Sequence, residues 1–280
     1  MKVLLADYSG FCFGVTKAID TAFEEVKRNK DKANYSLGPL IHNPQVVKSL
    51  EDEGVKIVED LENIHEGNVI IRSHGVPEKI YKIAEDKQLN IIDTTCPFVR
   101  RIQKIVKEYY DKDYQIAIIG NPHHPEVVGI NGWCYDRAII IQEPSDIDKI
   151  DGNQKLCVVV QTTMSLKVYK ELIQLLKAKV KDIEVFDTIC HATRHRQDAA
   201  KSLASKVDAM VIIGGNNSSN TQKLVTVCKE VIPDSTFHIE SVDELDIDVL
   251  KQYEVVGVTA GASTPIWVIN EVIEKLKKIN

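Results

Sequence analysis

Three cysteines occupy the same position in a pattern that the chain repeats, and this repeat constrains the fold more than any other feature. Cys96 and Cys190 follow the lead-ins Asp-Thr-Thr and Asp-Thr-Ile, each placed just after a short apolar segment. Cys12 likewise comes soon after the apolar segment KVLLAD. The stretches between the cysteines therefore resemble copies of one structural unit.

Short apolar segments alternate with amphipathic helical patterns along the whole chain. The segments NVIIR, QIAIIG and AMVIIG have the length and β-branched character of buried strands. Strands that alternate with helices are typical of an α/β protein with mainly parallel sheets. Helices are expected over residues 15–30, 77–87, 97–111, 166–180, 196–206, 221–231 and 265–278.

The repeat divides this α/β chain into three small lobes. The third copy lacks a closing strand after its last helix, and the N-terminal strand before Cys12 can supply it. The predicted lobes cover residues 14–96, residues 97–190, and residues 191–280 together with 1–13. A thiol at the same point of each lobe can then meet the other two on a pseudo-threefold axis, which places a metal centre in the middle.

Polar loops follow the strands of each copy and supply further candidates. Because parallel sheets bind ligands at the carboxyl ends of their strands, these loops are expected on the same side as the cysteines. Several of them could have simpler structural roles. The serines and Asn220 could cap a helix, and the Glu126 carboxylate could stabilise the start of a helix through the helix dipole. The candidates are His42, His74, His124, Glu126, Thr162, Ser218, Ser219, Asn220 and Ser263.

Composition and charge exclude several classes of protein. The net charge of −6, with scattered Lys and Arg, gives no basic stripe for nucleic acid. No apolar run approaches the roughly 20 residues that span a bilayer, and no signal segment is seen, so we expect a cytoplasmic protein. In a reducing compartment the cysteines favour metal ligation or free thiols over disulfides. Cys134, Cys157 and Cys228 lie in apolar contexts and are expected in the core.

Three thiolates without a fourth protein ligand suit one kind of metal centre better than others. A structural zinc site takes four ligands, whereas a 4Fe-4S cluster held by three cysteines keeps its fourth iron open for a substrate oxygen. The Ser, Asn, Thr and His donors suit a phosphate or diphosphate, and no nucleotide-binding P-loop is present. A nearby carboxyl group could deliver protons to a departing hydroxyl. Reductive dehydration of a phosphorylated alcohol is the simplest reaction that uses all three features.

The order of the motifs resembles that of one family, the 4-hydroxy-3-methylbut-2-enyl diphosphate reductases. The resemblance covers essentially the whole chain. It is carried by GFCFGV at 10–15, LGP at 37–39, HN at 42–43, RSHGV at 72–76, DTTCP at 93–97, HPEV at 124–127, QTT at 161–163, DTIC at 187–190, NSSN at 217–220 and GAS at 261–263. It implies three α/β lobes around one 4Fe-4S cluster, and conversion of the allylic alcohol diphosphate to isopentenyl and dimethylallyl diphosphates.

The resemblance also implies roles for individual residues. Cys12, Cys96 and Cys190 would bind the cluster. Glu126 would be the proton source, and Thr162 would hold the substrate hydroxyl or relay protons to it. The remaining candidates would form the diphosphate site, with His124 also assisting protonation: His42, His74, His124, Ser218, Ser219, Asn220 and Ser263. The two electrons would come from a donor of the ferredoxin or flavodoxin type.

Two alternatives from other classes stay open on the sequence. A hydratase or dehydratase could use the same cluster without net reduction, and it would turn over with no electron donor. A zinc-stabilised binding protein without catalysis would be colourless and would contain no sulfide.

Overall fold

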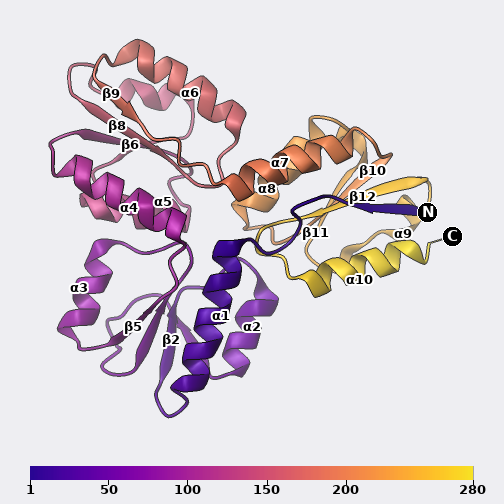
Figure 1. Ribbon diagram of the computed structural model, residues 1–280, viewed down its shortest axis with the longest axis horizontal. Coiled ribbons are helices and arrows are strands. Elements are labelled where there is room, and N and C mark those ends of the chain that lie inside the picture. The colour runs from indigo at the N-terminus through magenta and orange to yellow at the C-terminus, as the bar shows by residue number, and fades with distance from the viewer. Residues whose placement is uncertain (280) are drawn as a thin grey trace. The chain divides into compact units, whose positions relative to one another are not determined.

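The computed structural model describes residues 1–279, which form three four-stranded sheets. Every strand pairing within these sheets is parallel. Helices accompany each sheet (Figure 1). The prediction of an α/β protein with parallel sheets in three lobes is confirmed. Residue 280, the end of the predicted third lobe, lies outside the described residues.

The first sheet along the chain has the strand order β3-β2-β4-β5. These strands are β2 (Asn34–Leu37), β3 (Val55–Val58), β4 (Asn68–Ile71) and β5 (Asn90–Asp93). The helices of this part of the chain are α1 (Phe13–Arg28), α2 (Pro44–Asp52) and α3 (Glu78–Asp86). The chain leaves this sheet through the edge strand β5, directly before Cys96.

The second sheet repeats that order as β7-β6-β8-β9. Its strands are β6 (Gln115–Ile119), β7 (Ile139–Ile141), β8 (Leu156–Val160) and β9 (Ile183–Val185). Its helices are α4 (Pro97–Tyr110), α5 (Pro125–Asn131) and α6 (Leu166–Lys179), with 3₁₀ turns η1 (Gly132–Cys134) and η2 (Pro144–Lys149). The chain leaves through the edge strand β9, shortly before Cys190.

The third sheet has the order β1-β12-β10-β11, which is the same arrangement closed by the first strand of the chain. Its strands are β1 (Lys2–Leu5), β10 (Ala209–Ile213), β11 (Thr236–Ile239) and β12 (Val255–Ala260). Its helices are α7 (His191–Ala204), α8 (Ser219–Lys229), α9 (Ile247–Leu250) and α10 (Ile266–Lys277), with 3₁₀ turns η3 (Pro233–Ser235) and η4 (Val242–Glu244). β1 pairs with β12, and Lys2 lies beside Val255.

The described chain separates into two compact units. One comprises Met1–Val15, His42–Gln45 and Cys190–Asn280, and the other comprises Thr16–Ile41 and Val46–Ile189. The first unit holds the sheet that contains β1, and the second unit holds the other two sheets. Cys12 and Cys190 belong to the first unit, and Cys96 belongs to the second.

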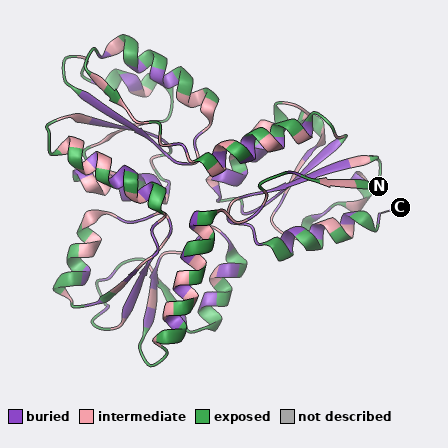
Figure 2. Cartoon of the chain, in the orientation of Figure 1, coloured by how far each residue is buried: buried purple, intermediate pink, exposed green. Residues whose placement is uncertain are grey.

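Both faces of the sheets are buried, as parallel sheets require. In the second sheet, Ala117 and Val158 face one apolar cluster, while their neighbours Ile118 and Val159 face another. α6 contributes to the first cluster, and α4 and α5 contribute to the second. The central strands are accordingly buried along their length (Figure 2). Cys134, Cys157 and Cys228 are fully buried in such clusters, which confirms their predicted place in the core.

The helix boundaries differ from the prediction where the pattern is polar. α7 begins at His191, directly after Cys190, and not at Arg196 as predicted. Its inward side is lined by Thr193, Arg196 and Gln197, so apolar periodicity gave no signal there. The short helices α2 and α9 were not predicted, and of α5 only a first turn at Glu126 was expected. At α3 and α10 the expected first residue, a proline, is the N-cap instead.

Candidate functional site

Each of the three candidate cysteines lies between an edge strand and the start of a helix. Cys96 is the N-cap residue of α4, and Cys190 is the N-cap residue of α7. Cys12 directly precedes the first residue of α1. All three are partly exposed, in contrast to the three core cysteines. The positive end of a helix dipole at each cysteine favours an anionic group there.

Burial separates the two sets of thiols chemically. It raises the pKa of Cys134 to about 11 and the pKa of Cys157 and Cys228 to about 12. Thiols with such pKa values stay protonated near neutral pH, and only a thiolate is a metal ligand. The core cysteines are therefore unsuited to hold a metal, which leaves the partly exposed set as the candidate ligands.

An aspartate shapes the turn before two of these cysteines. The Asp93 carboxylate accepts the backbone N–H of Thr95 at 2.9 Å, and the Asp187 carboxylate accepts that of Ile189 at 3.3 Å. Such bonds to the backbone two residues ahead are characteristic Asx turns. The same device, at the same spacing, thus turns the chain from strand to helix directly before Cys96 and Cys190.

The threonine that follows each aspartate ties the turn to the neighbouring strand. The Thr94 hydroxyl donates to the carbonyl of Ile71 at 2.5 Å, and the Thr188 hydroxyl donates to the carbonyl of Val160 at 2.5 Å. In each case the acceptor is the last residue of the adjacent strand, β4 or β8. The Asp-Thr lead-in, which the sequence repeats, therefore fixes the cysteine backbone relative to two strands.

Asp93 also belongs to a wider polar group in the second unit. Burial alone would raise its pKa, but the hydrogen bonds that its carboxylate accepts outweigh burial, and the pKa lies below its usual value. Tyr81 donates to it at 2.8 Å, and Arg100 of α4 forms an ion pair with it. This group fastens the first turn of α4, which begins after Cys96, to β5. Sequence analysis assigned no role to Asp93 or Asp187, although their equal spacing from the cysteines was the available signal.

Glu126 is a buried carboxyl group with a single partner residue. It lies in the first turn of α5 and is 2 % exposed. The backbone N–H of Thr162 donates to one carboxylate oxygen at 2.6 Å, and the Thr162 hydroxyl donates to the other at 2.6 Å. Burial raises the pKa of Glu126 to about 7, against the lowering effect of these hydrogen bonds. Near neutral pH this group can both carry a proton and release it, as a general acid must.

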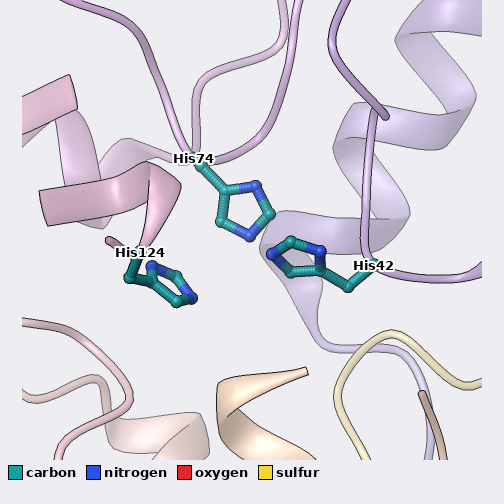
Figure 3. A group of neighbouring side chains, drawn as sticks. All are labelled: His42, His74 and His124. Atoms are coloured by element: carbon teal, nitrogen blue, oxygen red, sulfur yellow. The ribbon is translucent and has the colours of Figure 1, made fainter. Parts of the chain in front are cut away.

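His124 lies next to Glu126 in the same unit, and His74 contacts His124. His124 is the N-cap residue of α5, and its Nδ1 accepts the backbone N–H of Glu126 at 3.2 Å. An accepting Nδ1 leaves the proton of a neutral ring on Nε2. The rings of His74 and His124 meet edge to face with centroids 5.5 Å apart (Figure 3). The structure therefore brings together four predicted site residues: His74, His124, Glu126 and Thr162.

A second group of predicted residues lies in the first unit. Ser218 is the N-cap residue of α8, and its side chain accepts the N–H of Thr221 at 3.3 Å. Ser219 and Asn220 follow in the first turn, where Asn220 is buried and its side-chain nitrogen has no hydrogen-bond partner among residues 1–279. The Ser263 hydroxyl donates to the backbone carbonyl of His42 at 3.1 Å. The positive end of a helix dipole, with a buried amide donor beside it, is suited to an anion.

These features define a class: an α/β enzyme of three parallel-sheet lobes, with one partly exposed thiol between an edge strand and a helix in each repeat. Comparison with known proteins gives the particular family. The family described as LytB protein matches residues 3–277. The chain belongs to that family.

Relatives with a name match the whole chain. A protein of Alkaliphilus oremlandii is 54 % identical over 279 residues, with 100 % of each chain covered. A protein of Clostridioides difficile is 50 % identical over 283 residues, again with 100 % of each chain covered. Both relatives are named 4-hydroxy-3-methylbut-2-enyl diphosphate reductase.

Two solved structures are similar to this chain. The first is the E-1-hydroxy-2-methyl-but-2-enyl-4-diphosphate reductase from Plasmodium falciparum, with a TM-score of 0.93, 33 % identity, and 99 % of this chain and 88 % of that chain covered. The second is an (E)-4-hydroxy-3-methyl-but-2-enyl diphosphate reductase, described as the terminal enzyme of the non-mevalonate pathway. Its TM-score is 0.72 and its identity 38 %, with 100 % of each chain covered.

No helix among residues 1–279 has both the length and the apolar character that crossing a membrane requires.

Proposed function

We propose that this chain reduces 4-hydroxy-3-methylbut-2-enyl diphosphate, with loss of the hydroxyl group as water, to isopentenyl and dimethylallyl diphosphates. The name of relatives up to 54 % identical over the full length supports this activity. The observation that carries it in the structure is Glu126, a buried acid that is held by Thr162 at both oxygens and has a pKa of about 7. A hydroxyl group leaves as water only when it receives a proton, and a carboxyl group with this raised pKa can donate one near neutral pH.

The cofactor is one 4Fe-4S cluster per chain, with Cys12, Cys96 and Cys190 as its three protein ligands. The donor set fits: three partly exposed thiols remain once the protonated core thiols are set aside, and each precedes a helix. When bound, such a cluster supplies electrons and one iron that is open to a substrate oxygen. The direct electron donor is a small protein of the ferredoxin or flavodoxin type, and the chain works in the cytoplasm.

The proton reaches the substrate from the Glu126 carboxyl group. The Thr162 hydroxyl, now donating to Glu126, can turn to bind the substrate hydroxyl and pass the proton on. His124 assists, because its Nε2 carries the ring proton when Nδ1 accepts the N–H of Glu126. Because Glu126 is buried, bulk water does not compete for its proton, which is available to the leaving hydroxyl group.

The diphosphate is bound by hydrogen-bond donors, and histidines assist. Asn220 offers a buried side-chain N–H group that lacks a partner, at the start of α8. A phosphate oxygen would satisfy this donor, and the positive end of the helix dipole would favour its negative charge. The residues proposed for this site are His42, His74, His124, Ser218, Ser219, Asn220 and Ser263.

The repeat also supports a division of the chain for this function. We propose lobes at residues 14–96, at 97–190, and at 191–280 with 1–13, each contributing one cluster ligand from its closing edge strand. The pairing of β1 with β12 supports the assignment of the N-terminal strand to the third lobe. Residue 280 lies outside the described residues.

Replacing Glu126 tests the proposed function directly. Glu126→Gln keeps the size of the side chain but cannot release a proton, so turnover should fall by about 10²–10⁴-fold. Iron and sulfide content should stay at the wild-type level, because Glu126 is not a ligand. The matched control is Glu271→Gln, an exposed carboxylate on α10, which should leave turnover unchanged. Wild-type turnover in Glu126→Gln would remove Glu126 from its role.

A further inference from the structure

Arg196 is a buried cation on α7, six residues after Cys190. It is 4 % exposed, although arginine is seldom buried without an anionic partner. One of its terminal nitrogens donates to the carbonyl of Ala192, one turn earlier on the same helix, at 3.1 Å. The other donates to the carbonyl of Gly10 at 2.6 Å. Its Nε is buried and has no hydrogen-bond partner in the described part of the chain.

The bond to Gly10 joins two segments that lie far apart in the sequence. Gly10 is two residues before Cys12, in the loop between β1 and α1, whereas Arg196 lies on the helix that Cys190 begins. Both segments belong to the same compact unit. One guanidinium group therefore ties the Cys12 loop to the Cys190 helix.

The groups that can balance the charge of Arg196 are sulfur groups rather than carboxylates. Within residues 1–279, Arg196 forms no ion pair with a carboxylate. Burial lowers the pKa of its guanidinium, and the sulfur groups of Cys12 and Cys190 are placed to oppose this effect with negative charge when they are ionised or bound to a metal. A buried charge is costly unless it is paired, so these two sulfurs are the expected counter-charge.

We propose that Arg196 is a positioning residue for the iron–sulfur cluster: it holds the Cys12 loop to the Cys190 helix and places a fixed positive charge beside two of the cluster's ligands. This inference rests on the proposed function, because it requires the cluster. A positive charge stabilises the reduced cluster more than the oxidised one, since the reduced form carries one more negative charge. Arg196 thereby makes the cluster easier to reduce.

The test compares cluster potential and cluster retention in anaerobic holoenzyme. In Arg196→Gln the equilibrium constant for one-electron reduction should fall about tenfold, which corresponds to a shift of about 59 mV to lower potential. Iron should also be lost faster to a chelator, because the Cys12 loop is no longer tied. The matched control is Lys201→Gln, which removes an exposed positive charge from the same helix and should behave as wild type.

Arg196→Lys separates the two roles. Lysine keeps the charge but not the planar fork that reaches both carbonyl groups. The potential should stay near that of wild type, while iron is still lost to the chelator faster than from the control. Circular dichroism of each apoprotein identifies a variant that does not fold. If Arg196→Gln fails to fold, Arg196→Met replaces it as the variant without the charge, and iron loss from Arg196→Lys still decides the structural role.

The outcomes distinguish this inference from the function on which it rests. A wild-type protein without iron and sulfide would end the proposed function and this inference together. A loaded wild type, with potential and iron loss in Arg196→Gln equal to those in Lys201→Gln, would overturn only the role of Arg196. Wild-type iron retention in Arg196→Lys would overturn the structural part of that role.

Discussion

A single buried carboxyl group shows how the fold sets chemistry at the scale of one residue. Glu126 accepts two hydrogen bonds of 2.6 Å, which alone would hold its pKa low. Burial outweighs them and raises the pKa to about 7. Because burial is what raises this pKa, environment, not residue type, makes Glu126 a usable acid.

This raised pKa has a consequence for stability. The folded protein binds a proton at Glu126 up to about pH 7, whereas the unfolded chain releases it near pH 4.5. Stability from this group is therefore full below pH 4.5 and is lost as the pH rises through about 7. Relative to Glu126→Gln, the wild-type apoprotein should lose about 3 kcal/mol of unfolding free energy over that range.

Urea unfolding at several pH values measures that difference. Subtracting the Glu126→Gln curve removes the contributions of all other groups, provided that the variant keeps the fold. A difference that does not change between pH 4.5 and pH 7 would mean that Glu126 is ionised throughout, and its assignment as the proton donor would be lost.

Several residues of the site were accessible from the sequence because their chemistry is local. Cys12, Cys96 and Cys190 were recognisable from a repeated position alone. Arg196 was not, because its importance depends on Gly10, 186 positions away in sequence. Nothing in the neighbouring residues of α7 signals such a contact. The pKa of Glu126 was likewise beyond the sequence, since burial depends on how α5 packs.

At the scale of elements, the strands were predictable and the polar helix starts were not. The central strands β4, β8 and β10 coincide with short apolar segments, because buried parallel strands are apolar on both faces. α7 was predicted to start late, because its inward residues Thr193, Arg196 and Gln197 are polar. Arg196, to which we assign a role, is one of these polar residues. The part of α7 that apolar periodicity did not predict is therefore the part with a proposed role.

The loop between β1 and α1 offers a prediction at this scale. Gly10 has a φ of +85°, and a Cβ there would lie 3.0 Å from the Ile269 side chain and 3.2 Å from the Thr264 carbonyl oxygen. Gly10→Ala should therefore lower stability through both strain and crowding, and it should displace the Cys12 loop. Gly54→Ala is the matched control, because φ there is +91° but no atom lies within 4 Å of the added Cβ.

The two variants share the backbone strain, which costs about 1–2 kcal/mol. We expect Gly10→Ala to have the lower melting temperature and to retain less iron after anaerobic reconstitution, while Gly54→Ala retains the wild-type amount. Equal iron retention in the two variants would show that the Cys12 loop tolerates displacement, which would contradict a strict position for this ligand.

At the scale of the whole molecule, the account depends on a threefold repeat in one chain. The three sheets have the same strand order when each is read from the edge strand that precedes a cysteine. The third sheet reaches this order only because β1 pairs with β12. The sequence predicted the three lobes for the same reason, since each copy has the same succession of apolar and amphipathic segments. That the three sulfurs bind one cluster stays a prediction.

The iron and sulfide content of anaerobically prepared protein tests this claim most directly. Wild type and the Cys228→Ala variant, which lacks only a core thiol, should each contain about four iron and four sulfide ions per chain. Cys96→Ser should lose most of both. A colourless wild type that holds zinc and no sulfide, or a Cys96→Ser variant with its full complement of iron and sulfide, would contradict the assignment of the three cysteines to one cluster.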